Sequence, residues 1–123
     1  MDFSPNKPIY RQIIDYSFGR ILTGAWTPGE RVPSVREMSV ELSVNSHTVL
    51  KAYEYLQAEE IIVAKRGMGF YLASDAMERV NHARREEFFD TTLKEVFREM
   101  KLLDISIEEI VTHFRQQETQ SDA

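Results

Sequence analysis

The sequence contains no cysteine, so disulfides and thiolate metal sites are excluded. The first ten residues, MDFSPNKPIY, lack the basic start and the apolar run of a signal peptide. No stretch approaches the roughly 20 apolar residues that a membrane-spanning helix requires. These absences lead us to expect a cytoplasmic protein with no membrane partner.

Patterns typical of catalysis are also missing. No serine and histidine arrangement indicates a nucleophile, and no glycine-rich loop follows a long strand. Carboxylates are adjacent at Glu86-Glu87 and at Glu108-Glu109, but neighbouring residues on a helix do not face each other. We therefore expect neither an enzyme nor a bound cofactor.

Charge is distributed unevenly along the 123 residues, whose net charge is −5. Residues 1–74 carry eight Lys/Arg and eight Asp/Glu, whereas residues 75–123 carry seven and twelve. The excess acidity thus lies in the C-terminal part, and the N-terminal part can still present a local basic face. An apolar content of 42% is typical of a folded chain.

The N-terminal part predicts three helices. The first begins at Pro8 and ends near Gly24, with apolar residues at helical spacing: Ile9, Ile13, Tyr16 and Ile21. TPGERVP (27–33) is a turn, and Ser34 with Glu37 forms a capping box for a short helix to about Leu42. After a tight connection, Asn45 or Ser46 caps the third helix, whose apolar stripe is Val49, Ala52, Tyr53 and Leu56.

The pattern then changes to short β-branched runs and returns to helix. IIVAK (61–65), RGMG (66–69) and FYLA (70–73) predict a two-stranded hairpin. A long helix is expected from Asp75 to about Lys101, and a last helix follows a capping box at Ser106 and Glu109. The expected fold is mainly α with a small β-hairpin. It comprises a winged helix-turn-helix (1–74), a C-terminal helical hairpin for dimerisation (75–118) and a polar tail (119–123).

The start of the third helix carries more polar groups than a cap requires. Asn45, Ser46, His47 and Thr48 stand in a row before Lys51. In a helix-turn-helix, the second helix of the pair lies in the major groove and its N-terminal residues contact base edges. These residues alone are also compatible with simple capping, and the wing favours DNA contact.

Four stretches of the chain resemble the GntR family of bacterial transcription regulators. They are PIYRQI (8–13), GAWTPGERVPSVREMSVEL (24–42), VNSHTVLKAYEYLQAEEII (44–62) and RGMGFYL (66–72). The short C-terminal segment is similar to that of the YtrA-like subfamily. Relatives often have glycine where this chain has Ser43 and Glu60, just past helix ends, where a non-glycine residue in the left-handed conformation costs about 1 kcal/mol.

The resemblance implies a double-stranded DNA partner and a set of contact positions. Arg36 matches the arginine that reaches the DNA, the third helix contacts bases and phosphates, and the wing approaches the minor groove. The candidate DNA-binding residues are Arg36, Asn45, Ser46, His47, Thr48, Lys51, Lys65, Arg66, Gly67 and Gly69. At the wing, the glycines can equally serve only the turn.

Two apolar stripes in the C-terminal segment indicate pairing with a second copy of the chain. The candidate interface residues are Phe89, Leu93, Val96, Met100, Leu103, Ile107, Ile110, Val111 and Phe114. We therefore expect a sequence-specific DNA-binding regulator, with a homodimeric repressor on an inverted-repeat operator as the favoured form. The operator, the regulated genes and any small-molecule effector cannot be identified from the sequence.

Two alternatives remain open at this point. Carboxylates and imidazoles at i, i+4 spacing could hold zinc or manganese in a metal-responsive regulator, although a self-compensating solvated surface is favoured and no metal is expected. The residues concerned are Glu78, His82 and Glu86, with Glu109 and His113 on the last helix. A winged helix can also bind protein in place of DNA.

Overall fold

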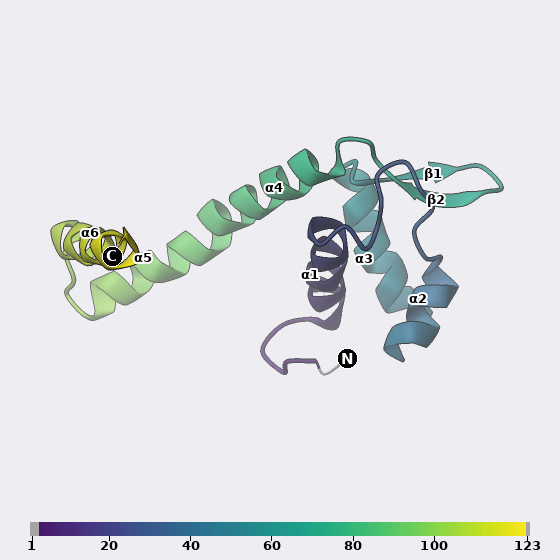
Figure 1. The fold of residues 1–123 in the computed structure, drawn as a ribbon. Helices are drawn as coiled ribbons and strands as arrows, with labels where there is room; N and C mark the ends of the chain where they lie inside the picture. The colour runs from purple at the N-terminus through teal and green to yellow at the C-terminus, as the bar shows by residue number, and fades with distance from the viewer. Residues whose placement is uncertain (1–2, 123) are drawn as a thin grey trace. The chain divides into compact units, whose positions relative to one another are not determined.

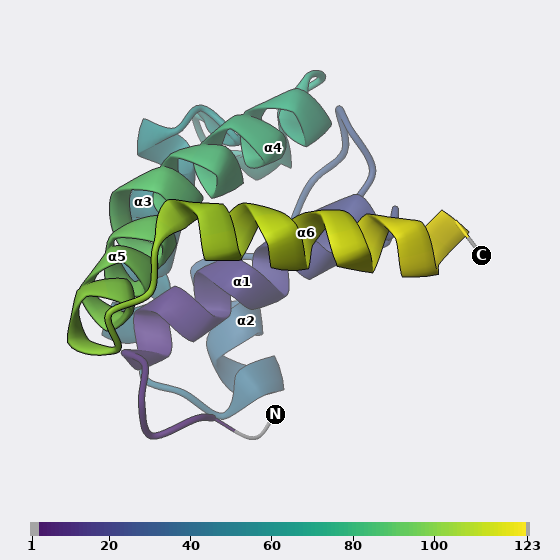
Figure 2. The same cartoon turned by 90° about the vertical axis from the view of Figure 1, so that its left-hand side faces the viewer.

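The computed structural model describes residues 3–122, which form two compact units divided between Ala83 and Arg84. In the first, the winged-helix unit, three helices lie together and a hairpin follows them (Figures 1 and 2). Its elements are α1 (Ile9–Leu22), α2 (Val35–Leu42), α3 (Ser46–Ala58), β1 (Ile62–Lys65) and β2 (Gly69–Leu72). The predicted helices and hairpin of the winged helix-turn-helix are confirmed.

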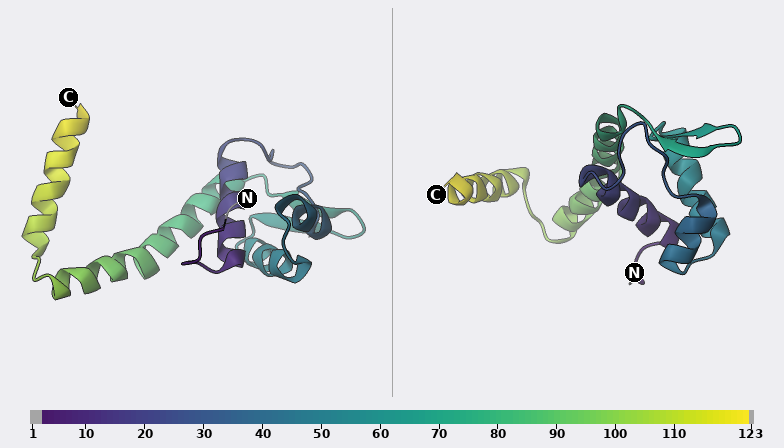
Figure 3. Two further views of the ribbon diagram at one scale, coloured as in Figure 1. Left: turned by 90° about the horizontal axis from the view of Figure 1, so that it is seen from below. Right: turned by 45° about the vertical axis from the view of Figure 1, so that its right-hand side comes forward.

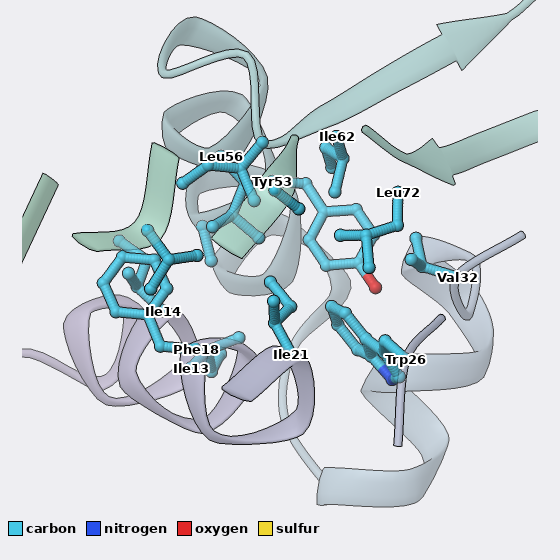
Figure 4. Packing of buried hydrophobic residues seen from close by; sticks show 14 of the residues in the cluster. Ile13, Ile14, Phe18, Ile21, Trp26, Val32, Tyr53, Leu56, Ile62 and Leu72 are labelled. Carbon is cyan, nitrogen blue, oxygen red and sulfur yellow. The ribbon is translucent and has the colours of Figure 1, made fainter. Parts of the chain in front are cut away.

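One apolar core holds the winged-helix unit together. Tyr53 of α3 lies at its centre, among side chains from α1, the 24–33 connection and the hairpin (Figure 4). Burial of each large side chain of this kind contributes roughly 1.5–3 kcal/mol, so the core fixes α3 against the hairpin.

Helix α4 (Ala76–Glu87) extends the winged-helix unit beyond the predicted boundary at residue 74. Ala76, Val80 and Ala83 share one helical face and are buried in the same core. Two of the three are alanines, which give a weak apolar pattern, so the sequence did not reveal that this face packs inward.

The C-terminal unit contains α5 (Leu93–Leu102) and α6 (Ile107–Asp122). A π-helical turn, η1 (Phe88–Thr92), separates α4 from α5, where an uninterrupted helix from Asp75 to Lys101 was predicted. Helix α6 turns away from α5 after a tight connection and does not lie along it (Figure 3). Because α6 continues to Asp122, the predicted polar tail at 119–123 is helical through its described residues.

Left-handed backbone occurs at Ser43 and Glu60, each just past the end of a helix. Ser43 has φ 55° just past α2, and Glu60 has φ 59° just past α3. In both places, the next backbone N–H turns back onto the preceding helix: Val44 donates to the Ser39 carbonyl and Ile61 to the Leu56 carbonyl. This chain therefore adopts the left-handed conformation past both helices with side chains in place.

Candidate nucleic-acid interface

The first turn of α3 presents polar groups to solvent. The Asn45 Oδ1 atom accepts a hydrogen bond from the His47 backbone N–H at 2.8 Å, so Asn45 is the cap. Asn45 is itself exposed, next to the exposed Ser46 and His47 and the half-buried Thr48. A helix start with these donors and its positive dipole end is suited to bases and phosphates.

Lys51 lies one turn further along α3 and is exposed. Its ammonium group stands 4.0 Å from the centre of the Tyr10 ring on α1, a cation–π contact. The ring limits the motion of this long side chain while the charge still reaches solvent. The sequence predicted the position of Lys51 but not this support from α1.

Arg36 occupies the first turn of α2 and is exposed. The capping box beneath it is complete, because the Glu37 N–H donates to the Ser34 hydroxyl and the Ser34 N–H donates to the Glu37 carboxylate. The Ser34 backbone N–H is the main cause of a pKa of Glu37 below its usual range, followed by the Ser34 hydroxyl and the nearby Arg31 charge. Arg31 Nη2 lies 3.1 Å from the same carboxylate.

The wing is an antiparallel pair in which Ile62 faces Leu72 and Lys65 faces Gly69. The segment before α2 runs beside β2 and forms backbone hydrogen bonds with it. The Gly29 N–H donates to the Leu72 carbonyl, the Leu72 N–H donates to the Glu30 carbonyl, and the Val32 N–H donates to the Phe70 carbonyl. The wing is thereby tied directly to the segment that leads into Arg36.

The tip of the wing is basic and contains two glycines in the left-handed region. Lys65 and Arg66 are exposed, and the Lys65 ammonium lies 4.1 Å from the Tyr71 ring centre. Gly67 has φ 74° and Gly69 has φ 95°. A Cβ at Gly69 would also stand 3.1 Å from Arg31 Nε, so both backbone angle and space favour glycine there.

The sequence over residues 9–72, from α1 to β2, matches a family model for bacterial regulatory proteins of the gntR family. The chain belongs to the gntR family. It is a DNA-binding transcriptional regulator, and its relatives are named as regulators and not as enzymes.

Named relatives support this assignment over different lengths. The uncharacterised HTH-type transcriptional regulator YhcF of Bacillus subtilis is 33% identical over 109 residues, 89% of this chain and 88% of that protein. The HTH-type transcriptional repressor YtrA of the same organism is 41% identical over 76 residues, 62% of this chain and 58% of YtrA. A GntR family transcriptional regulator from Listeria monocytogenes is 34% identical with a TM-score of 0.68, covering 93% of this chain and 98% of that one.

Tyr53 of this gntR-family chain links α3 to the start of α2 and to the wing. Its buried hydroxyl donates to the Pro33 carbonyl at 2.6 Å, just before α2. Its ring meets the Phe70 ring of the wing edge-on, with centres 5.4 Å apart. Burial raises the pKa of the Tyr53 hydroxyl, which therefore remains a neutral donor. The sequence identified Tyr53 only as part of an apolar stripe.

Arg79 fastens the start of α4 to the end of α3. Its Nε lies 3.0 Å from both carboxylate oxygens of Asp75, and its Nη1 lies 2.8 Å from Glu60. Glu60 therefore combines left-handed backbone with an ion pair to α4. The pairing joins residues 19 apart in the chain and carries no sequence motif.

The possible metal ligands do not form a site in the part of the chain that the structure describes. Glu78, His82 and Glu86 follow one another on α4, while Glu109 and His113 lie on α6. Within the described residues, no three His, Cys, Asp or Glu side chains are grouped so that they could hold a metal ion. None of the helices described there is long and apolar enough to cross a membrane.

The C-terminal unit exposes much of its apolar surface. Across residues 84–120, no described residue is buried, and Phe114 is 62% exposed. Of the candidate interface residues, only Leu93, Met100 and Ile110 are half-buried. Phe88, Phe97 and Leu102 are also exposed and were not in the predicted stripes.

Proposed function

We propose that this regulator is a homodimeric repressor that reads an inverted-repeat operator in the cytoplasm. In this proposal, the winged-helix unit reads DNA and the C-terminal helices pair two chains. The observation that carries it is the exposed polar first turn of α3, a helix whose Tyr53 bonds to the Pro33 carbonyl and meets Phe70 of the basic wing.

Each element has a distinct role in the proposed complex. The α3 tip, from Asn45 to Thr48, enters the major groove, with Arg36 beside it at the edge of the groove. Lys51, Lys65 and Arg66 contact phosphates, and the tip of the wing approaches the minor groove. Phosphate contacts fix the register of the protein on the duplex, whereas the α3 tip selects the sequence.

Pairing of two chains determines the form of the operator. A two-fold dimer requires two half-sites in inverted orientation, separated by about one helical turn, roughly 10 bp, or a multiple of it. A dimer bound over a promoter would block polymerase. The repressor role is supported by the name of YtrA, and the dimer by the uncovered apolar face of the C-terminal unit.

Selection of bound duplexes from a random pool tests the whole proposal. We expect an enriched inverted repeat whose affinity falls steeply with salt, because several phosphate contacts each release counterions. A single unpaired half-site would contradict the dimer. Binding to no duplex at any salt concentration would contradict DNA recognition and favour a protein partner for the wing.

A further inference from the structure

Met68 places an apolar side chain at the tip of the basic wing. The turn between β1 and β2 is closed by the Met68 N–H, which donates to the Lys65 carbonyl at 2.9 Å. Gly67 and Gly69 flank Met68 and carry no side chain, and Met68 is 60% exposed. A side chain of this kind is more easily explained by a contact outside the unit than by packing within it.

We propose that Met68 enters the minor groove beside each half-site and makes the wing select A·T pairs there. This inference rests on the proposed function, because it assigns a specificity to a wing that contacts DNA. It differs from that proposal in making an apolar residue, and not only the cations, responsible for base preference.

The charges around Met68 favour the DNA minor groove as its binding site. Lys65 and Arg66 precede it on the hairpin, and the Arg31 guanidinium lies against the backbone at Gly69. An apolar side chain with cations around it matches a groove whose floor is base edges and whose walls are phosphates. The minor groove is only about 6 Å wide, and a glycine-flanked tip with one unbranched side chain can enter it.

The chemistry of the groove floor explains why A·T pairs would be preferred to G·C pairs. A·T and T·A pairs present only acceptors in the minor groove, whereas guanine adds its N2 amine as a donor that projects from the floor. A methionine thioether has little ability to accept a hydrogen bond from this amine, so contact would bury a donor without a partner. A·T pairs under the wing avoid this cost and give the side chain a clear path.

Met68→Gln is the decisive variant because glutamine has nearly the same shape but can accept a hydrogen bond from the guanine amine. Wild type and Met68→Gln are each used to select duplexes from a random pool, with Met77→Gln as the control at an exposed methionine on α4. Met68 is exposed, so all three proteins should unfold at the same temperature. We expect A·T enrichment beside the half-sites for wild type and Met77→Gln, and its loss for Met68→Gln with the half-sites retained.

Inosine then shows which groove is read. In the best selected duplex, an A·T pair under the wing is replaced by G·C or by inosine·C, which lacks the minor-groove amine but keeps the major-groove pattern of G·C. We expect wild type to lose about fivefold in affinity with G·C, the lower end for one unfavourable pair, and to regain it with inosine. Met68→Gln should discriminate by less than about twofold.

The outcomes separate this inference from the proposed function. Enriched half-sites without A·T preference, an A·T preference that survives in Met68→Gln, or no rescue by inosine would each overturn the role of Met68 alone. No enriched half-site with wild type would overturn the proposed function, and the inference with it.

Discussion

Ser43 has its side chain on left-handed backbone, with φ 55° and ψ 47° after the end of α2. Glycine adopts these angles without the steric cost of a Cβ. We predict that Ser43→Gly raises the free energy of unfolding by about 0.5–1 kcal/mol, as measured by chemical denaturation. Glu54→Gly in the middle of α3 is the matched control and should lower it by a similar amount, because its backbone is right-handed. Equal effects of the two substitutions would contradict this account.

Glu37 makes the stability of the fold depend on pH. Its pKa is lowered first by the Ser34 backbone N–H, so the folded chain binds this proton more weakly than the unfolded chain does. Stability from the carboxylate is therefore fully present above the ordinary glutamate pKa and is lost as the pH falls through the lowered value.

We predict that Glu37→Gln is less stable than wild type at pH 7 and that this difference shrinks below about pH 5. Denaturant unfolding of both proteins across this range measures the effect. A difference that stays constant or grows as the pH falls would show that the carboxylate charge is not responsible.

Substitution of Arg36 tests DNA binding without disturbing the folded core. It is exposed on the first turn of α2, and no core contact depends on it. We predict that Arg36→Ala weakens operator binding by about 1–3 kcal/mol, as expected for an arginine lost from a specific contact, while thermal unfolding stays unchanged. Operator titration of both proteins is the measurement, and equal affinities would remove Arg36 from the interface.

Local interactions between residues were predictable from the sequence, but distant ones were not. The Ser34–Glu37 capping box was predicted, and the cap of α3 was narrowed to Asn45 or Ser46, because cap and partner are two or three residues apart. The bond from Tyr53 to the Pro33 carbonyl spans 20 residues. It depends on the packing of α3 under the connection before α2, and no local pattern encodes it.

At the scale of elements, the local pairing of the wing was predictable, but its contact with a distant segment was not. Two β-branched runs around a glycine turn predicted β1 and β2, and their pairing is confirmed. The segment before α2 pairs with β2 through an antiparallel β-bridge between Arg31 and Tyr71, but the sequence predicted only a turn there. Its Pro-Gly composition is poor for a strand, and its hydrogen bonds join it to residues some forty positions later.

The charges of the wing should act mainly through phosphates. We predict that Lys65→Ala and Arg66→Ala each reduce the slope of log affinity against log salt by about one unit, with little change in the selected half-site. Duplex titrations at several salt concentrations provide the slope. Arg20→Ala, an exposed cation at the end of α1, is the control and should leave it unchanged. If both wing variants keep the wild-type slope, the hairpin does not contact the DNA backbone.

At the scale of the whole molecule, the chain divides within α4. The first part of this helix belongs to the winged-helix core through Val80 and Ala83, and the second unit begins at Arg84. Apolar periodicity in the sequence revealed the C-terminal helices but not this boundary, because it does not show which apolar faces pack against which core. The described part of the second unit has no buried residue of its own.

Such a unit requires a covering surface. About forty residues rarely sustain an independent core. Val96, Phe97 and Phe114 are 38%, 45% and 62% exposed in the single chain, and the half-buried Leu93 lies one turn from Val96 and Phe97. The same face of a second copy would cover these side chains about a two-fold axis and would exclude water from both.

We predict that Leu93→Glu converts a dimer into monomers. A carboxylate at this position would be buried between the two chains without a partner, at a cost on the order of 3–5 kcal/mol. The dimer dissociation constant should rise at least about a hundredfold, and operator affinity should fall because a single half-site contributes too little binding free energy. Thr91→Glu adds the same charge at an exposed polar position two residues away and should remain dimeric. Sedimentation at micromolar concentration, run beside operator titration, decides the matter: a wild-type monomer that still binds an inverted repeat tightly would refute this arrangement.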